Sequence, residues 1–141
     1  MATKEIKGAK AAVTPGNAWW IGLAAWLVPG LGHFLQRRWL RGGLIAGSVC
    51  VMFLTGLKLG GHLFAVSGQD RGVSVLLHGL PMVANAGSGA LYIFCWMTDI
   101  GFGEHPALVS FEYGNTFLLV AGLLNYLGML DAFDIRAWRN A

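Results

Sequence analysis

Four histidines are the side chains in this sequence best suited to bind a metal or a cofactor. His62 and His78 flank a short polar segment between two long uncharged runs, so both imidazoles are expected near the same membrane surface. Two imidazoles at similar depth on neighbouring helices could bind haem, or another tetrapyrrole, from opposite sides. Histidines that only contact water at a membrane surface would show the same spacing. We therefore expect no cofactor, with tetrapyrrole binding by His62 and His78 as the alternative.

The other candidates do not form a reactive set. Ser88 lies between Gly87 and Gly89, where it could act as an intramembrane nucleophile, but this reaction needs a histidine base on a neighbouring helix. The last uncharged run contains no histidine. His105 follows Glu104 without the regular ligand spacing of zinc sites. The sequence thus predicts no catalytic residues, no metal site and no enzymatic activity.

The elements that carry these residues follow from composition and from the positions of charges. Of the 141 residues, 55% are hydrophobic and 12% are charged, about half the charged share of a soluble domain. This balance excludes a soluble globule and a disordered chain, and two cysteines exclude a disulfide scaffold. A membrane-spanning helix needs about 20 mostly apolar residues. Four runs are close to this length or exceed it, namely residues 18–36, 42–61, 72–98 and 113–130.

These four runs predict an all-α integral membrane protein with four transmembrane helices in two antiparallel hairpins. The chain would begin with a flexible polar tail, continue with the first hairpin, and then form helices 3 and 4 around an extramembrane loop. A short interfacial tail would end it. The corresponding ranges are 1–17 for the first tail, 18–61 for the first hairpin, 72–130 for helices 3 and 4, 99–112 for the loop, and 131–141 for the second tail.

Charge also predicts an orientation. With four spans, both termini lie on one side, and seven of the ten Lys and Arg residues fall there. The other three, Arg37, Arg38 and Arg41, fall in the turn of the first hairpin on the opposite side. Cytoplasmic loops carry the excess of basic residues, so the sequence favours cytoplasmic termini and a periplasmic loop at 99–112. The dense arginine turn favours the reverse orientation.

Two asparagines within the expected spans should be bonded, because an unpaired amide in hydrocarbon costs several kcal/mol. Asn85 lies in the third run and Asn125 in the fourth. We expect them to bond to each other or to a backbone carbonyl and so to join helices 3 and 4. Alternatively, they face a partner subunit.

The first hairpin carries a motif, Pro29-Gly30-Leu31-Gly32-His33, followed by Arg37, Arg38 and Arg41, and Pro29 should kink or end the first helix. This segment resembles the hairpin of the small two-transmembrane-helix domain superfamily. Together with the runs Tyr113-Gly114-Asn115-Thr116-Phe117 and Leu130-Asp131-Ala132-Phe133-Asp134-Ile135, it is similar to an uncharacterised family of small bacterial multi-span proteins. The resemblance implies a bacterial inner-membrane protein and supplies no activity.

The sequence therefore predicts a non-enzymatic membrane protein. Uncharged spans, small residues on their surfaces and the lack of a catalytic set are typical of an accessory or stabilising subunit of a larger membrane complex. Its expected partners are the lipid bilayer and other membrane protein subunits, and no nucleic acid.

Overall fold

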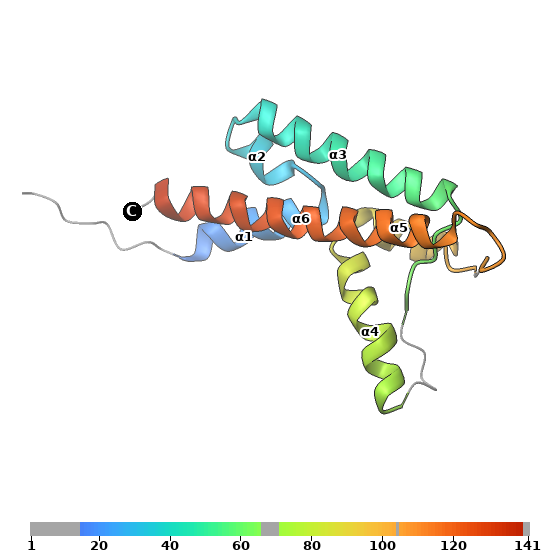
Figure 1. Ribbon diagram of the computed structural model, residues 1–141. Coiled ribbons are helices and arrows are strands. Elements are labelled where there is room, and N and C mark those ends of the chain that lie inside the picture. Colours follow the sequence, from blue (N-terminus) through green and yellow to red (C-terminus); the bar gives the residue numbers. More distant parts are fainter. Residues whose placement is uncertain (1–14, 66–70, 104, 140–141) are drawn as a thin grey trace, which may run out of the picture.

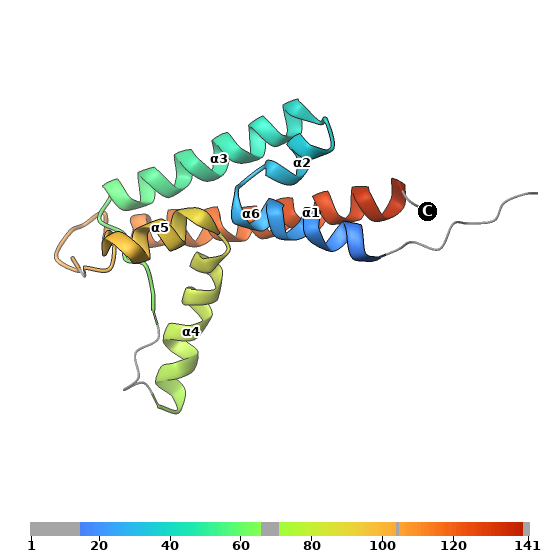
Figure 2. The same cartoon turned by 180° about the vertical axis from the view of Figure 1, so that it is seen from behind.

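The computed structural model describes residues 15–65, 71–103 and 105–139. Within these ranges every regular element is a helix and no strand occurs, so the all-α prediction is confirmed. Figures 1 and 2 show the arrangement from opposite sides. In chain order the helices are α1 (Pro15–Leu27), α2 (Leu31–Leu35), α3 (Trp39–Lys58), α4 (Val73–Ala86), α5 (Ala90–Thr98) and α6 (Phe111–Arg139).

The two longest helices, α3 and α6, pack side by side and antiparallel. Ile45 of α3 contacts Gly128, whereas Gly56, near the other end of α3, contacts Leu118. Among the described helices, only these two are long and apolar enough to cross a membrane on their own. A third span exists only if α4 and α5, which meet at an angle of 116°, are counted as one. The four transmembrane helices expected from the sequence are therefore not confirmed.

The first expected span is divided into two short helices that lie at the same end of the bundle. α1 has 13 residues and ends at Leu27, before the turn that contains Pro29 and Gly30. Gly30 adopts a φ of +80°, which favours glycine, and its backbone packs against Gly42 at the start of α3. The chain therefore reverses inside the bundle, and α2 returns toward the end from which α1 came (Figure 2).

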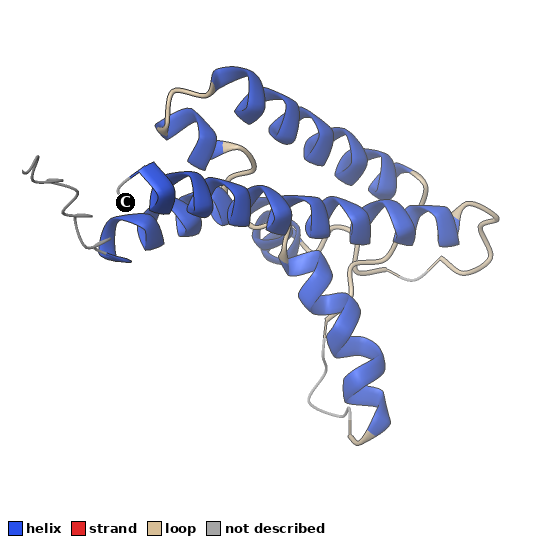
Figure 3. Ribbon diagram, turned by 60° about the vertical axis from the view of Figure 1, so that its left-hand side comes forward, coloured by secondary structure: helices blue, strands red, loops and turns tan. Residues whose placement is uncertain are grey.

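The third expected span is also divided. Its break falls at residues 87–89 rather than at Pro81, which lies inside α4. After the break α5 runs toward the end of the bundle at which α3 also ends, and the backbone N–H of Leu63 donates to the carbonyl of Gly101 at 2.7 Å. This bond shows that α3 and α5 end at the same end of the bundle. α4 projects away from the other helices (Figure 3), and residues 71–78 are all exposed.

The two ends of the bundle carry different charges. At the end that we call the arginine end, Arg41 lies 3.7 Å from Asp131, and Arg38 lines a hollow with Asp134. The arginine turn is therefore beside the C-terminal part of α6, and the expectation that it lies on the side opposite the termini is wrong. The physical reason is the reversal at Pro29, because of which the first apolar run does not cross the bundle. The opposite end, which holds Lys58 and the 99–110 loop, is called the loop end.

The hydrophobic core lies between α3, α5 and the first half of α6. Phe53 and Leu118 are its largest fully buried side chains from α3 and α6, and Leu63 closes it at the loop end. Cys95 belongs to this core. Both Cys95 and Cys50 are free thiols. The buried members are Val49, Phe53, Leu63, Tyr92, Cys95, Leu118 and Ala121.

Glycines on α3 differ in what surrounds them, and this gives a matched test of the packing. A Cβ on Gly56 would lie 2.7 Å from Leu118 Cγ and 2.9 Å from the Gly114 carbonyl oxygen, whereas Gly47 has nothing within 4 Å. Gly56→Ala should lower the free energy of unfolding by about 1–3 kcal/mol through overpacking. Gly47→Ala should leave it unchanged or raise it by up to about 1 kcal/mol through helix propensity. Thermal or denaturant unfolding in detergent measures both, and equal effects would contradict the α3–α6 contact.

Candidate functional site

The broken helices meet around one side chain in the middle of α6. Asn125 is fully buried, and its Nδ2 donates to the carbonyl oxygens of Trp26 at 2.8 Å and Gly87 at 2.7 Å. Trp26 lies in the last turn of α1, and Gly87 is the C-cap of α4. The last carbonyls of a helix have no partner within the helix. One amide group therefore satisfies carbonyls at the ends of two different helices.

Two aromatic side chains complete this junction. The Trp26 indole Nε1 donates to the carbonyl of Ala86 at 3.1 Å, and the Tyr126 hydroxyl donates to the carbonyl of Val83 at 2.8 Å. The last turn of α4 is thus bonded to both α1 and α6. These bonds attach the C-terminal end of α4, whereas residues 73–78 at its start are exposed.

The C-terminal end of α1 also meets the N-terminal end of α5. Gly89, the N-cap of α5, packs against the carbonyls of Trp26 and Leu27, and a Cβ there would lie 2.7 Å from the Leu27 oxygen. Its φ of +60° again favours glycine. Figure 2 shows α1 and α5 following one another along α6. The negative end of one helix dipole faces the positive end of the next, which stabilises the contact.

Several polar atoms at this junction have no hydrogen-bond partner within the described part of the chain. They are both amide atoms of Asn85, the hydroxyl of Ser88 and Oδ1 of Asn125, and all are buried. Asn85 and Asn125 are not bonded to each other in the structure, which places Asn125 against backbone carbonyls instead. No histidine bonds to Ser88, so the serine has no activating base here.

A second polar cluster lies at the arginine end. The fully buried His33 of α2 bonds through Nε2 to Asp131 Oδ2 at 2.8 Å, and Gln36 donates to the carbonyl of Ala132 at 2.8 Å. Gly32 allows the close approach, because a Cβ there would lie 2.8 Å from Ala132 Cβ. These contacts attach α2 to α6. They connect residues almost 100 positions apart, so no local spacing in the sequence could have revealed them.

The histidines considered as cofactor ligands lie toward the loop end and on α4. The backbone N–H of His62 donates to Asn115 Oδ1 at 2.6 Å, and its ring packs edge-on against Phe64. His78 lies on the exposed part of α4. No group of three or more His, Cys, Asp or Glu side chains in the described residues could hold a metal ion. Tetrapyrrole binding by His62 and His78 stays a prediction.

Fold and site together define a small all-helical protein, in which two helices are long enough to cross a membrane and two broken segments meet beside them. The chain belongs to a family of unknown function, DUF6677, whose profile matches residues 20–141. This match confirms the expectation of an uncharacterised family. No curated protein and no solved structure matches the chain significantly.

The junction predicts the effect of substitutions at Asn125. Asn125→Leu removes two hydrogen bonds and leaves two buried carbonyls without that donor, so the free energy of unfolding should fall by about 1–3 kcal/mol. Asn125→Asp should be worse, because a carboxylate there accepts bonds where donors are needed and is costly to ionise. Leu127→Ala, on the exposed face of α6, is the control and should have a small effect. Unfolding in detergent measures all three, and an unchanged stability in Asn125→Leu would contradict the role assigned to the amide.

Proposed function

We propose that this chain is a multi-pass protein of the bacterial inner membrane that acts, without catalysis of its own, as an accessory or stabilising subunit of a larger membrane complex. The observation that carries the proposal is the position of α4. Its apolar side chains Leu76 and Leu80 are 69% and 73% exposed, and Asn85 is its one buried residue. The first part of the helix, residues 73–78, is therefore exposed, and only its C-terminal part packs against the rest of the chain.

The direction of α4 supports contact with protein rather than with lipid alone. α4 and α5 are bent by 116°, so α4 does not run along the direction of α3 and α6 (Figure 1). If α3 and α6 cross the bilayer, α4 extends sideways into the hydrocarbon, and Arg71 precedes it by only two positions. A charged side chain at that depth is costly unless protein or water surrounds it. A neighbouring subunit that packs along α4 would provide such an environment.

Site-specific photocross-linking tests this proposal. A photoreactive residue replaces Leu76 or Leu80 on α4, and the controls replace Leu44 or Val51 on α3, which are 70% and 64% exposed. We expect α4 positions to form cross-links to a second, different protein in native membranes, and α3 positions to react mainly with lipid. Native mass measurement after mild extraction should show the 15.1 kDa chain within a larger particle.

Two outcomes of this experiment would overturn the proposal. One is a monomer whose α4 positions react only with lipid, as the α3 controls do. The other is cross-linking of α4 only to a second copy of the same chain, which would indicate a homo-oligomer rather than a subunit of another complex.

We also infer a membrane topology with two crossing helices, α3 and α6, and two re-entrant pairs, α1–α2 and α4–α5. Charge supports cytoplasmic placement of the arginine end. Eight of the ten Lys and Arg residues belong to that end or to the N-terminal segment that joins it, and only Lys58 and Arg71 do not. This asymmetry is stronger than that of a four-span arrangement, because the arginine turn no longer opposes the termini.

Cysteine labelling distinguishes the two topologies. In a chain with Cys50 and Cys95 replaced by alanine, Val109→Cys should react with an impermeant thiol reagent in intact cells, and Arg37→Cys should be protected. A four-span protein with cytoplasmic termini would expose both positions to the reagent. Labelling at Arg37→Cys with protection at Val109→Cys would instead reverse the whole orientation.

The tetrapyrrole alternative has one supporting observation. Nδ1 of His62 is buried and has no hydrogen-bond partner in the described ranges, so it has a free position for a ligand. An absorption spectrum of the protein, purified after expression with haem available, tests this directly. A visible band that disappears in His62→Ala would support binding, and its absence from the native chain would exclude it.

A further inference from the structure

The α2–α3 turn gathers positive charge that the chain itself does not neutralise. Arg37, Arg38 and Arg41 are all exposed, and neither Arg37 nor Arg38 has an ion-pair partner among the described residues. The guanidinium of Arg41 lies 3.7 Å from Asp131, which is beyond hydrogen-bond length, and the same carboxylate oxygen already bonds to His33 at 2.8 Å. Most of the guanidinium donors therefore remain available to an anion.

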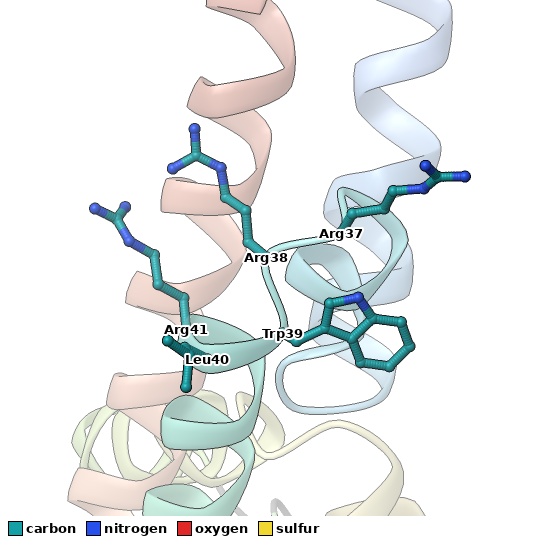
Figure 4. A pocket seen from close by; sticks show the side chains of 5 residues that line it. All are labelled: Arg37, Arg38, Trp39, Leu40 and Arg41. Carbon is teal, nitrogen blue, oxygen red and sulfur yellow. The ribbon is translucent and has the colours of Figure 1, made fainter.

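The start of α3 adds a second source of positive potential at the same place. Arg38 is the N-cap of this 20-residue helix, no side chain caps its first turn, and that turn holds no acidic residue. Free N–H groups and the helix dipole make such an end favourable for a phosphate group. The five residues from Arg37 to Arg41 line a hollow of about 330 Å³ (Figure 4). Positive charge, free hydrogen-bond donors and a hollow large enough for an anion therefore occur at the same place.

The surroundings of the turn indicate that an anion bound here carries an apolar tail. Figure 4 shows Leu40 next to the base of the Arg41 side chain, whereas the Trp39 ring points to the other side of the turn. Leu40 is 85% exposed, and Trp39, an aromatic ring of the kind found at the headgroup level, is 68% exposed. From Leu40 an exposed stripe continues along one face of α3 at helical spacing, through Leu44, Gly47, Val51 and Leu54.

At the centre of this stripe, Gly47 leaves the helix backbone without a covering side chain. A Cβ at Gly47, or at Gly43 beside it, would meet nothing within 4 Å, so neither glycine serves contacts within the chain. Larger side chains, Leu44 and Val51, lie before and after Gly47 on the same face, whereas Gly47 itself places no side chain there. Such a face fits a flexible acyl chain laid along the helix.

We propose that the α2–α3 turn and the first half of α3 bind one anionic phospholipid. Its phosphate is held by Arg38, Arg41 and the free N–H groups of the first turn of α3. One acyl chain lies over Leu40, Gly47 and Val51. Guanidinium groups suit this role because they form paired hydrogen bonds with phosphate oxygens.

The test measures lipid retention by the full-length chain. The purified protein is equilibrated with equal amounts of phosphatidylglycerol and phosphatidylcholine of the same acyl chains and analysed by native mass spectrometry. We expect selective retention of one phosphatidylglycerol. The double variant Arg38→Gln/Arg41→Gln should reduce it by about fivefold for each arginine removed. Lys58→Gln/Arg71→Gln removes the same charge away from the turn and should change retention less than twofold.

Three further arms separate this site from its alternatives. Arg38→Lys/Arg41→Lys keeps the charge but loses the paired guanidinium hydrogen bonds, so it should retain more lipid than the glutamine variant and less than the native chain, which also controls for loss of folding. Gly47→Leu, which enters open space, should weaken retention with every arginine intact. Excess inorganic phosphate should not displace the lipid.

Each opposite result overturns the proposal. Equal retention of the two lipids, or equal losses in the two glutamine variants, would indicate general attraction to the membrane. Displacement by inorganic phosphate would indicate a site for a free anion. Unchanged retention in Gly47→Leu would exclude the acyl contact on α3.

Discussion

The backbone carbonyls at the ends of broken helices need hydrogen-bond donors, and this requirement determines how the helices are arranged around α6. Asn125 supplies two bonds, and the Trp26 indole and the Tyr126 hydroxyl supply one each. Away from water, non-helical backbone is tolerated only where protein satisfies its polar groups. The breaks after α1 and α4 are therefore possible because both lie against the same stretch of α6. Glycines at 87, 89 and 122 bring the chains close enough for these bonds.

The same helix holds the other elements by polar contacts at its two ends. At the arginine end Asp131 accepts from the buried His33, which attaches α2. At the loop end Ser110, just before α6, donates to the carbonyl of Leu59 at 2.8 Å, and Asn115 accepts from the backbone of His62. The two contacts at the loop end join α6 to the segment that follows α3, and the contact at the arginine end joins it to the short helix α2. Polar contacts of α6 therefore position α2 and the end of α3, while apolar packing between α3 and α6 buries most of the surface.

The sequence predicted the helical class and the positions of the uncharged runs because both depend on composition and charge spacing. It also predicted that the first helix would be kinked or would end near Pro29, and the structure shows that it ends there. It did not predict that the chain reverses there, because a proline that ends a helix does not determine the direction of the next one. The break at residues 87–89 was missed because glycines such as Gly87 and Gly89 are also common at close contacts between unbroken helices. The partners of Asn125 lie 38 and 99 residues away and the partner of His33 lies 98 residues away, and only the folded chain brings them together.

The position of Asn125 after α1, α4 and α5 in the chain has a consequence for biosynthesis. A ribosome completes these three helices before α6 has emerged, so the carbonyls of Trp26 and Gly87 are without this donor until residue 125 has been synthesised. α1 has 13 residues and α5 has 9, and neither is long enough to span a bilayer alone. The junction therefore cannot assemble before α6 arrives, and a chain truncated before residue 125 would retain its apolar segments without the amide that joins them.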